Sequence, residues 1–215
     1  MTISVPRLDR LPAQERGITI ADFLVPIRVA EGIGVRVRHL ALVLAGTLLI
    51  VLAAQVRFYL PNDPIIPVTG QTFGVLLVGG ALGYRRGIAS TALYLVLGLV
   101  GLPVFADGTH GLAIVLGASG GYLVGFILAA AVIGRLAELG WDRNVLGSIG
   151  AMVAGSLLIY VVGVPWLAFT TGHALDWAVT YGMTPFLPGD ILKLVLAAGA
   201  FPTAWWIVGR RPGDR

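Results

Sequence analysis

Asp190 and Lys193 are opposite charges three residues apart, near the start of an apolar stretch that runs to Val208. Lys193 is the only lysine in the chain. In a helix, a spacing of three residues places both side chains on one face. Because an ionised group costs about 2.5–3.5 kcal/mol at the centre of a bilayer, the pair predicts a polar functional site. The alternative is that Asp190 caps the helix and that Lys193 extends to the membrane surface.

The composition of the chain is that of an integral membrane protein. Of its 215 residues, 57% are hydrophobic and 12% are charged, and the mean hydropathy is +0.88. Soluble domains usually contain about 25% charged residues. The absence of cysteine excludes disulfides, thiolate metal sites and cysteine nucleophiles. We interpret the net charge of +4 as a sign of membrane topology and not of nucleic-acid binding.

The hydropathy pattern divides the chain into polar tails and a membrane domain. Residues 1–35 are predicted to form an N-terminal cytoplasmic tail, either mobile or with a surface helix between Ile18 and Ala30. Residues 36–210 are predicted to form a six-helix membrane domain for substrate binding, and residues 211–215 a C-terminal cytoplasmic tail. The six apolar segments cover residues 40–59, 68–83, 87–102, 112 or 119 to 139, 145–167 and 188–208.

Arginines are concentrated in alternate connections between these segments. The other connections have only Arg57 and Lys193 as basic residues. The positive-inside rule makes the arginine-rich side cytoplasmic, and an even number of spans places both chain ends on that side. The sequence therefore predicts an all-α integral membrane protein with six transmembrane helices and cytoplasmic N and C termini. The arginines on the cytoplasmic side are Arg36, Arg38, Arg85, Arg86, Arg135, Arg143, Arg210, Arg211 and Arg215.

The sequence lacks the common signatures of hydrolytic and metal chemistry. It has no G-x-x-x-x-G-K-[ST] phosphate loop and no G-x-S-x-G serine motif. Its three histidines have no second ligand at metal-binding spacing. We therefore expect a protein that is not an enzyme and that holds no metal and no cofactor.

Polar residues collect at the predicted outer ends of the apolar segments, where they would form a small cup. Binding sites for small molecules combine apolar walls with a few oriented polar groups. The connection before the last segment is expected to form a short helix across the mouth, from Ala174 to Met183. Candidate walls are Phe73, Phe105, Tyr122, Trp166 and Trp177, although the aromatic residues also fit a membrane-interface belt. The polar candidates are Thr69, Gln71, Thr72, Asp107, Thr109, Ser119, Tyr122, Asp190 and Lys193.

Small residues recur on the first apolar segment. Ala41 and Ala45 are four residues apart, and Gly46 follows. Small residues at this spacing allow another helix to approach closely. The face fits either internal packing or the docking of a partner.

Four sequence blocks, in order, resemble the BioY family, the biotin-specific substrate-binding subunits of energy-coupling factor (ECF) transporters. The resemblance covers about residues 38–208. Asp107 departs from it, because many members are rich in glycine or serine at this position. The blocks are P-V-T-x-Q-T at 67–72, G-L-P-V-F-A at 101–106, G-x-x-G-G-Y at 117–122 and P-G-D-x-x-K at 188–193.

The resemblance implies a six-helix subunit in the plasma membrane of a prokaryote that binds biotin near its outer face. It also implies a partner complex of one membrane scaffold subunit and two ATPase subunits. Ala41 and Ala45 match the family's A-x-x-x-A docking face, which favours the partner interpretation.

The chemistry of biotin suits the predicted cup. The ureido ring of biotin offers two N–H donors and a carbonyl acceptor, so that Asp190 can accept an N–H and Lys193 can donate to the carbonyl. Lys193 is equally a candidate partner for the carboxylate of biotin. Tyr122 and Phe105 are expected to cover the ring and the valeryl chain. The remaining polar contacts are assigned to Thr69, Gln71, Ser119 and Asp107.

Three other functions compete with biotin capture. The first is a stand-alone ion- or proton-coupled transporter in which Asp190 titrates. The second is a membrane enzyme that acts on a lipid or a vitamin precursor. The third is a subunit of the same fold for another vitamin.

Overall fold

The computed structural model describes residues 19–24, 34–58 and 68–208. Nearly all regular structure in these ranges is helical, which confirms the predicted all-α class. The one exception is a short antiparallel pair of β1 (Arg57–Phe58) with β2 (Val68–Thr69). The long helices are α2 (Val35–Gln55), α3 (Gln71–Leu99), α5 (Gly120–Glu138), α6 (Val145–Thr171) and α8 (Leu187–Val208). The short helices are α1 (Ile20–Leu24), α4 (Leu112–Leu116), α7 (Leu175–Gly182), η4 (Ala106–Gly108), η5 (Trp141–Arg143) and η6 (Thr184–Phe186).

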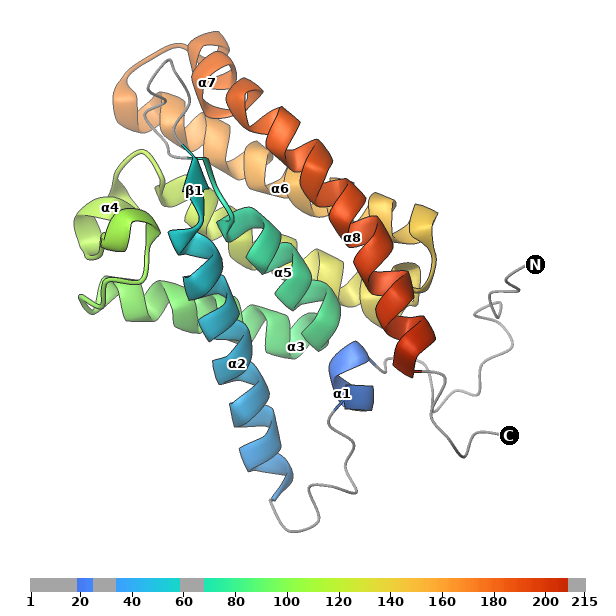
Figure 1. The fold of residues 1–215 in the computed structure, drawn as a ribbon. Coiled ribbons are helices and arrows are strands. Elements are labelled where there is room, and N and C mark those ends of the chain that lie inside the picture. The colour runs from blue at the N-terminus through green and yellow to red at the C-terminus, as the bar shows by residue number, and fades with distance from the viewer. Residues whose placement is uncertain (1–18, 25–33, 59–67, 209–215) are drawn as a thin grey trace, which may run out of the picture.

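Two of the six predicted apolar segments lie in α3. The backbone of Gly83 has φ 82° and ψ −179°, which interrupts the helix between its two halves. Side chains other than glycine rarely adopt this conformation. A Cβ atom added to Gly87 would lie 3.1 Å from Cα of Gly79, so the two halves lie close together. Figure 1 shows the chain changing direction sharply at this point.

Four stretches within the described residues are long and apolar enough to cross a membrane: Arg36–Gln55, Gly120–Glu138, Val145–Thr171 and Leu175–Ile207. Each half of α3 is shorter than the roughly 20 residues that a straight span requires. The predicted membrane character is therefore confirmed, whereas the count of six spans stays a prediction.

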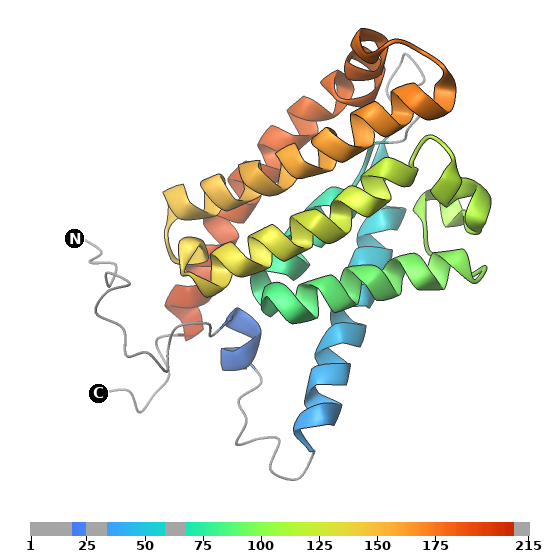
Figure 2. The same ribbon diagram turned by 180° about the vertical axis from the view of Figure 1, so that it is seen from behind.

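α5 is the central helix of the bundle, with α3 on one side and α6 on the other (Figure 2). Its inward face is dominated by small and apolar residues. A Cβ atom added to Gly125 would lie 2.9 Å from Cα of Ile159 on α6. Close packing of this kind depends on small residues at the helix interface. The outer faces of α2 and α6 are apolar and exposed, as at Leu48 and Leu157, which suits contact with lipid.

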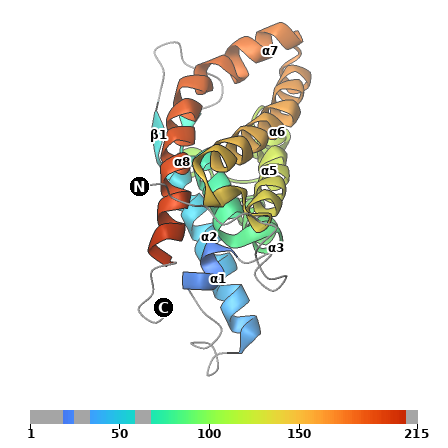
Figure 3. The same ribbon diagram turned by 90° about the vertical axis from the view of Figure 1, so that its right-hand side faces the viewer.

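The predicted helix between Ala174 and Met183 is confirmed as α7, Leu175–Gly182. Figure 3 shows α7 lying across one end of the bundle, between α6 and α8. η5, α1 and the bend of α3 lie toward the opposite end (Figure 2). α7 therefore covers the end of the bundle at which α8 begins with Asp190 and Lys193.

The N-terminal segment that the structure describes is held against the bundle by ion pairs. Asp22 of α1 accepts from Arg38 of α2 at 2.9 Å and from Arg86 of α3 at 2.8 Å. Ile20 and Ala21 are buried. α1 falls within the range predicted as a surface helix but is only five residues long. Most of the predicted N-terminal tail, and the whole C-terminal tail at 211–215, lie outside the described residues.

We expect Asp22→Asn to lower the thermal unfolding temperature of the protein in detergent by several degrees. Burial opposes ionisation of Asp22, but the hydrogen bonds from Arg86 and Arg38 outweigh it and lower the pKa of its carboxyl group from 3.8 to about 2. An acid whose pKa is lowered by folding stabilises the folded state above its unfolded pKa. The difference in unfolding temperature between wild type and variant is therefore present above pH 3.8 and disappears as the pH falls through about 2.

The matched control for this prediction is Asp176→Asn, because Asp176 is exposed at the start of α7, where its carboxylate accepts from the Trp177 backbone N–H. It should change the unfolding temperature by less than about one degree. Equal unfolding temperatures for the two variants at neutral pH would show that the ion pairs of Asp22 contribute nothing to stability.

Candidate functional site

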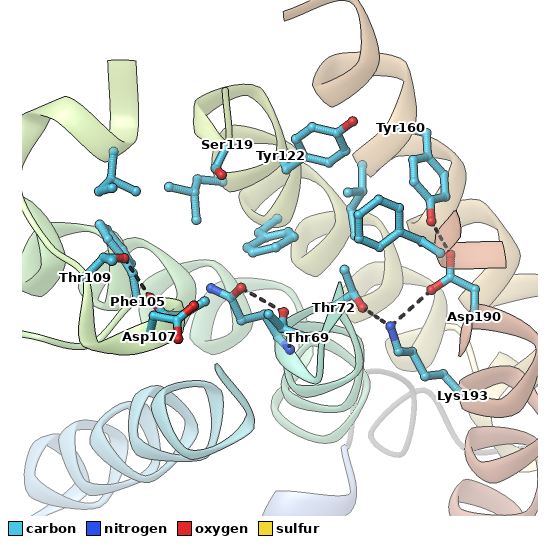
Figure 4. Close-up of a pocket in the computed structure, with 17 residues that line it drawn as sticks. Thr69, Thr72, Phe105, Asp107, Thr109, Ser119, Tyr122, Tyr160, Asp190 and Lys193 are labelled. Atoms are coloured by element: carbon cyan, nitrogen blue, oxygen red, sulfur yellow. Dashed lines mark hydrogen bonds and ion pairs between the residues drawn. The ribbon is translucent and has the colours of Figure 1, made fainter. Parts of the chain in front are cut away.

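A cavity of about 230 Å³ lies between α3, α5, α6 and α8, at the end of the bundle that α7 covers. All eight residues predicted to contact substrate line this cavity, and Figure 4 shows most of them facing a common space. The structure thus brings together side chains that are up to 124 positions apart, from Thr69 to Lys193. The eight are Thr69, Gln71, Phe105, Asp107, Ser119, Tyr122, Asp190 and Lys193.

Asp190 and Lys193 form an ion pair at one end of the cavity, with 3.2 Å between Lys193 Nζ and Asp190 Oδ1. Their side chains are only 11% and 13% exposed. Each has a further partner on another helix. The hydroxyl group of Tyr160 on α6 donates to Asp190 Oδ2, and Lys193 Nζ donates to Thr72 Oγ1 on α3 at 2.6 Å. Burial makes these charged hydrogen bonds stronger than they would be in water.

A second hydrogen-bonded chain runs along the α3 side of the cavity. Thr69 Oγ1 donates to Gln71 Oε1 at 2.8 Å, and Gln71 Nε2 donates to the hydroxyl oxygen of Tyr94 at 2.5 Å. Thr69 and Gln71 are both buried. These bonds fix the orientation of the Gln71 amide at the cavity wall.

Phe105 forms part of the wall beside this chain. Its ring packs edge-on against Tyr94, with 5.4 Å between ring centroids and 74° between ring planes. Gly98 of α3 makes room for it, because a Cβ atom there would lie 2.1 Å from the Phe105 ring. The loop that carries Phe105 is also held by Gln55, whose Nε2 donates to the Phe105 carbonyl at 3.3 Å.

Tyr122 is the second predicted aromatic wall, and its hydroxyl group already has a partner. The hydroxyl donates to the carbonyl of Gly182 at 2.8 Å and so ties α5 to α7. The Tyr122 ring packs against Gly163 of α6, where a Cβ atom would lie 2.5 Å from it. Tyr122 therefore offers its ring to the cavity and uses its hydroxyl group to hold the covering helix.

Three other aromatic residues expected as walls do not line the cavity. Trp166 donates from Nε1 to the carbonyl of Gly117 at 2.9 Å, and Trp177 stacks on His173 with 3.9 Å between ring centroids. Phe73 is also absent from the lining, although it follows Thr72 directly on α3. The lining contains Phe126 and Phe186 instead, because the faces of α5 and η6 that point inward are set by helix packing.

Asp107 borders the cavity at the end opposite to Asp190 (Figure 4). Its backbone has φ 61°, a left-handed conformation that aspartate tolerates better than most residues. Its carboxylate forms an ion pair with Arg57 of β1, and both side chains are about one-third exposed. The cavity thus has a buried ion pair at one end and a partly exposed ion pair at the other.

Ser119 lines the cavity directly before α5, where it stands as the N-cap residue without a side-chain capping bond. Tyr160, Tyr94 and Thr109 complete the set of polar residues around the site. Thr72 and Thr109 were among the polar residues singled out from the sequence. Tyr160 and Tyr94 were missed, and the only signal for Tyr160 was a lone tyrosine near the middle of an apolar segment.

A helical membrane protein that encloses a small cavity lined by apolar walls and a few oriented polar groups has the design of a membrane-embedded receptor for a small molecule. The profile of the BioY family matches residues 27–210, and the chain belongs to this family. The resemblance stated from the sequence is therefore confirmed.

Curated relatives and a solved structure agree with this assignment. The chain is 42% identical to the biotin transporter BioY of Thermotoga maritima over 152 residues, which cover 71% of this chain and 86% of the relative. It is 37% identical to the biotin transporter BioY of Rhizobium etli over 140 residues, covering 62% and 74%. The crystal structure of the S-component for biotin from an ECF-type ABC transporter is similar with a TM-score of 0.72 and 27% identity, covering 80% of this chain and 92% of that one.

Proposed function

We propose that this chain captures biotin at the outer face of the membrane as the substrate-binding subunit of an ECF transporter. The observation that carries the proposal is the buried Asp190–Lys193 pair, which lies in the cavity of a protein whose family members are biotin transporters. The pair places a carboxylate acceptor beside an ammonium donor. A ureido group has an N–H donor next to a carbonyl acceptor, and so it can bind the carboxylate and the ammonium group at the same time.

The two ion pairs support one orientation of biotin in the cavity. The neutral ureido ring lies at the buried Asp190–Lys193 end, where no net charge has to be matched. The carboxylate of biotin lies at the Asp107 end, where both side chains of the Asp107–Arg57 pair are about one-third exposed and a charged group can stay hydrated. This orientation assigns Lys193 to the ureido carbonyl and leaves the charged tail of the ligand near water. Phe105 and Tyr122 then flank the apolar middle of the ligand.

The proposal includes six membrane passes with both termini in the cytoplasm of a prokaryotic cell and the protein in its plasma membrane. The two halves of α3 supply one short pass each, and α2, α5, α6 and α8 supply the others. Short passes are tolerated where neighbouring helices and loops cover their ends. Arg38, Arg86 and Arg135 all belong to the end of the bundle away from α7, which supports this orientation under the positive-inside rule.

The proposed partners are a membrane scaffold subunit, which docks on α2, and two cytoplasmic ATPase subunits. Ala41 and Ala45 are exposed on α2, whereas Gly46 is buried. A Cβ atom on Gly46 would lie 2.6 Å from side-chain atoms of Leu82 and Ser90 of α3. The small residues thus serve two faces: Gly46 packs within the chain, and the two alanines leave a smooth outer surface for a second helix.

Equilibrium binding of radiolabelled biotin to the purified protein tests the proposed function. We expect saturable binding that unlabelled biotin abolishes and that an excess of riboflavin or thiamine leaves unchanged. A wild-type protein that is folded by size-exclusion chromatography and binds no biotin would contradict the proposal. Displacement by another vitamin would redirect it to that substrate.

A further inference from the structure

The two charged residues at the end of the cavity are each held by a side chain from another helix. Tyr160 of α6 donates to Asp190 Oδ2, and Thr72 of α3 accepts from Lys193 Nζ at 2.6 Å. The bond to Thr72 is shorter than the 3.2 Å contact between Lys193 and Asp190. Figure 4 shows the four side chains as one continuous network from α3 through α8 to α6.

The hydrogen-bonding capacity that remains in this network is specific. An ammonium group has three N–H donors, and Thr72 and Asp190 take two of those of Lys193. An ionised carboxylate has about four acceptor positions, and Tyr160 and Lys193 use one position on each oxygen of Asp190. One donor on Lys193 and further acceptor positions on Asp190 are left for a ligand. Together they complement the adjacent N–H and C=O groups of a cyclic urea.

Without these two partners, the pair would have more freedom than recognition of a urea allows. A lysine side chain can lose up to about 2 kcal/mol of rotamer entropy when it is ordered, and the Asp190 carboxylate can rotate about its terminal bond. Asp190 and Lys193 are on the same helix, so their own contact does not fix either group relative to the other walls. The bonds to Tyr160 and Thr72 do so, because they anchor the pair to α6 and α3.

We propose that Tyr160 and Thr72 are positioning residues that set the specificity of the site for a urea-type edge, Tyr160 by orienting Asp190 and Thr72 by orienting Lys193. This inference rests on the proposed function, because it concerns the same ligand. It adds two residues to the Asp190–Lys193 pair and assigns each of them one partner through which it acts.

Double-mutant cycles with labelled biotin test the proposal, because residues that act through one another give non-additive effects. Tyr160→Phe and Thr72→Val should each weaken biotin binding about tenfold, whereas Thr72→Ser, which keeps the hydroxyl group, should stay within about twofold of wild type. In an Asp190→Ala background, Tyr160→Phe should change the affinity less than about twofold, and Thr72→Val should do the same in a Lys193→Met background.

Two control variants remove a tyrosine and a threonine hydroxyl group at positions outside this network. Tyr84→Phe removes the hydroxyl group of a tyrosine that is 43% exposed and follows the α3 bend. Thr170→Val removes a hydroxyl group that donates to the Trp166 and Leu167 carbonyls within α6. Both should bind biotin as the wild type does.

Two results would overturn the inference while leaving the proposed function intact. The first is wild-type affinity in Tyr160→Phe and Thr72→Val. The second is a tenfold loss that persists unchanged in the Asp190→Ala and Lys193→Met backgrounds, which indicates a role independent of the charged pair. Failure of the wild-type protein to bind biotin would instead overturn the proposed function and this inference with it.

Discussion

Replacing Lys193 or Asp190 with alanine is expected to weaken biotin binding at least tenfold, a loss of about 1.4 kcal/mol or more. Both side chains are almost fully buried in the cavity wall and form charged hydrogen bonds. Such bonds contribute about 1.5–3 kcal/mol each when the alternative is an unsatisfied group. Equilibrium binding of labelled biotin to the wild type and both variants measures the effect.

The interpretation depends on keeping the variants folded, because removing one member of a buried ion pair leaves the other charge without compensation. The expected penalty for this is about 3–5 kcal/mol of stability. Thermal unfolding and size-exclusion chromatography of each variant therefore accompany the binding measurement. Asp190→Asn and Lys193→Met keep the side-chain volume and serve as milder replacements. Wild-type affinity in both alanine variants would remove the pair from the site.

A partial role for the pair has its own signature. If Lys193 touches the ligand while Asp190 only neutralises it, Lys193→Ala should weaken binding much more than Asp190→Asn. Comparable losses indicate that both groups contact the ureido ring, as the proposed orientation requires.

The positions of the site residues could be predicted well from the sequence, because each one stands at the end of an apolar segment. Thr69 and Gln71 precede α3, Ser119 precedes α5 and Asp190 begins α8. A membrane forces helix ends to one of two surfaces, so polar residues at the same surface have a high chance of meeting. The cavity that these eight residues share follows from that constraint.

The residues that the sequence did not reveal depend on how neighbouring helices pack. Tyr160 meets Asp190 across 30 positions of sequence, and Tyr94 meets Gln71 across 23. Which face of α6 points at α8 is set by side-chain packing along both helices, and the uniformly apolar pattern of α6 does not indicate it. The same argument explains why Trp166 was a candidate wall although its indole N–H bonds to Gly117 outside the cavity.

The sequence predicted the break in α3, because the apolar segments 68–83 and 87–102 are separated by Arg85 and Arg86. It did not show that the break is a sharp bend at one glycine within a continuous helix. Gly79, Gly80, Gly83 and Gly87 fall within a short stretch, and glycine alone does not distinguish a loop from a close helix contact. In the structure only Gly83 among them has a positive φ. The others lie at close contacts, such as that between Gly80 and the Phe201 ring.

Ala41→Trp is expected to leave biotin binding intact and to abolish assembly with the scaffold subunit. Ala41 is exposed on the outer face of α2 and does not line the cavity, so the larger ring should leave the ligand site unchanged. A close helix–helix contact depends on small side chains, and an indole at its centre would separate the two helices over several residues. Co-purification of the scaffold subunit with the affinity-tagged chain, from cells that express the whole transporter, measures assembly.

Leu157→Trp is the matched control, because Leu157 is 55% exposed on α6 and the substitution adds the same ring to another exposed apolar face. It should bind biotin and co-purify with the scaffold subunit as the wild type does.

Ala45→Trp should behave like Ala41→Trp, because Ala45 lies one turn further along the same face of α2. Retention of the scaffold subunit by both tryptophan variants would show that α2 is not the docking face. If Leu157→Trp also loses the scaffold subunit, added bulk disrupts assembly at any exposed apolar face. The effect of Ala41→Trp would then not indicate a specific contact on α2.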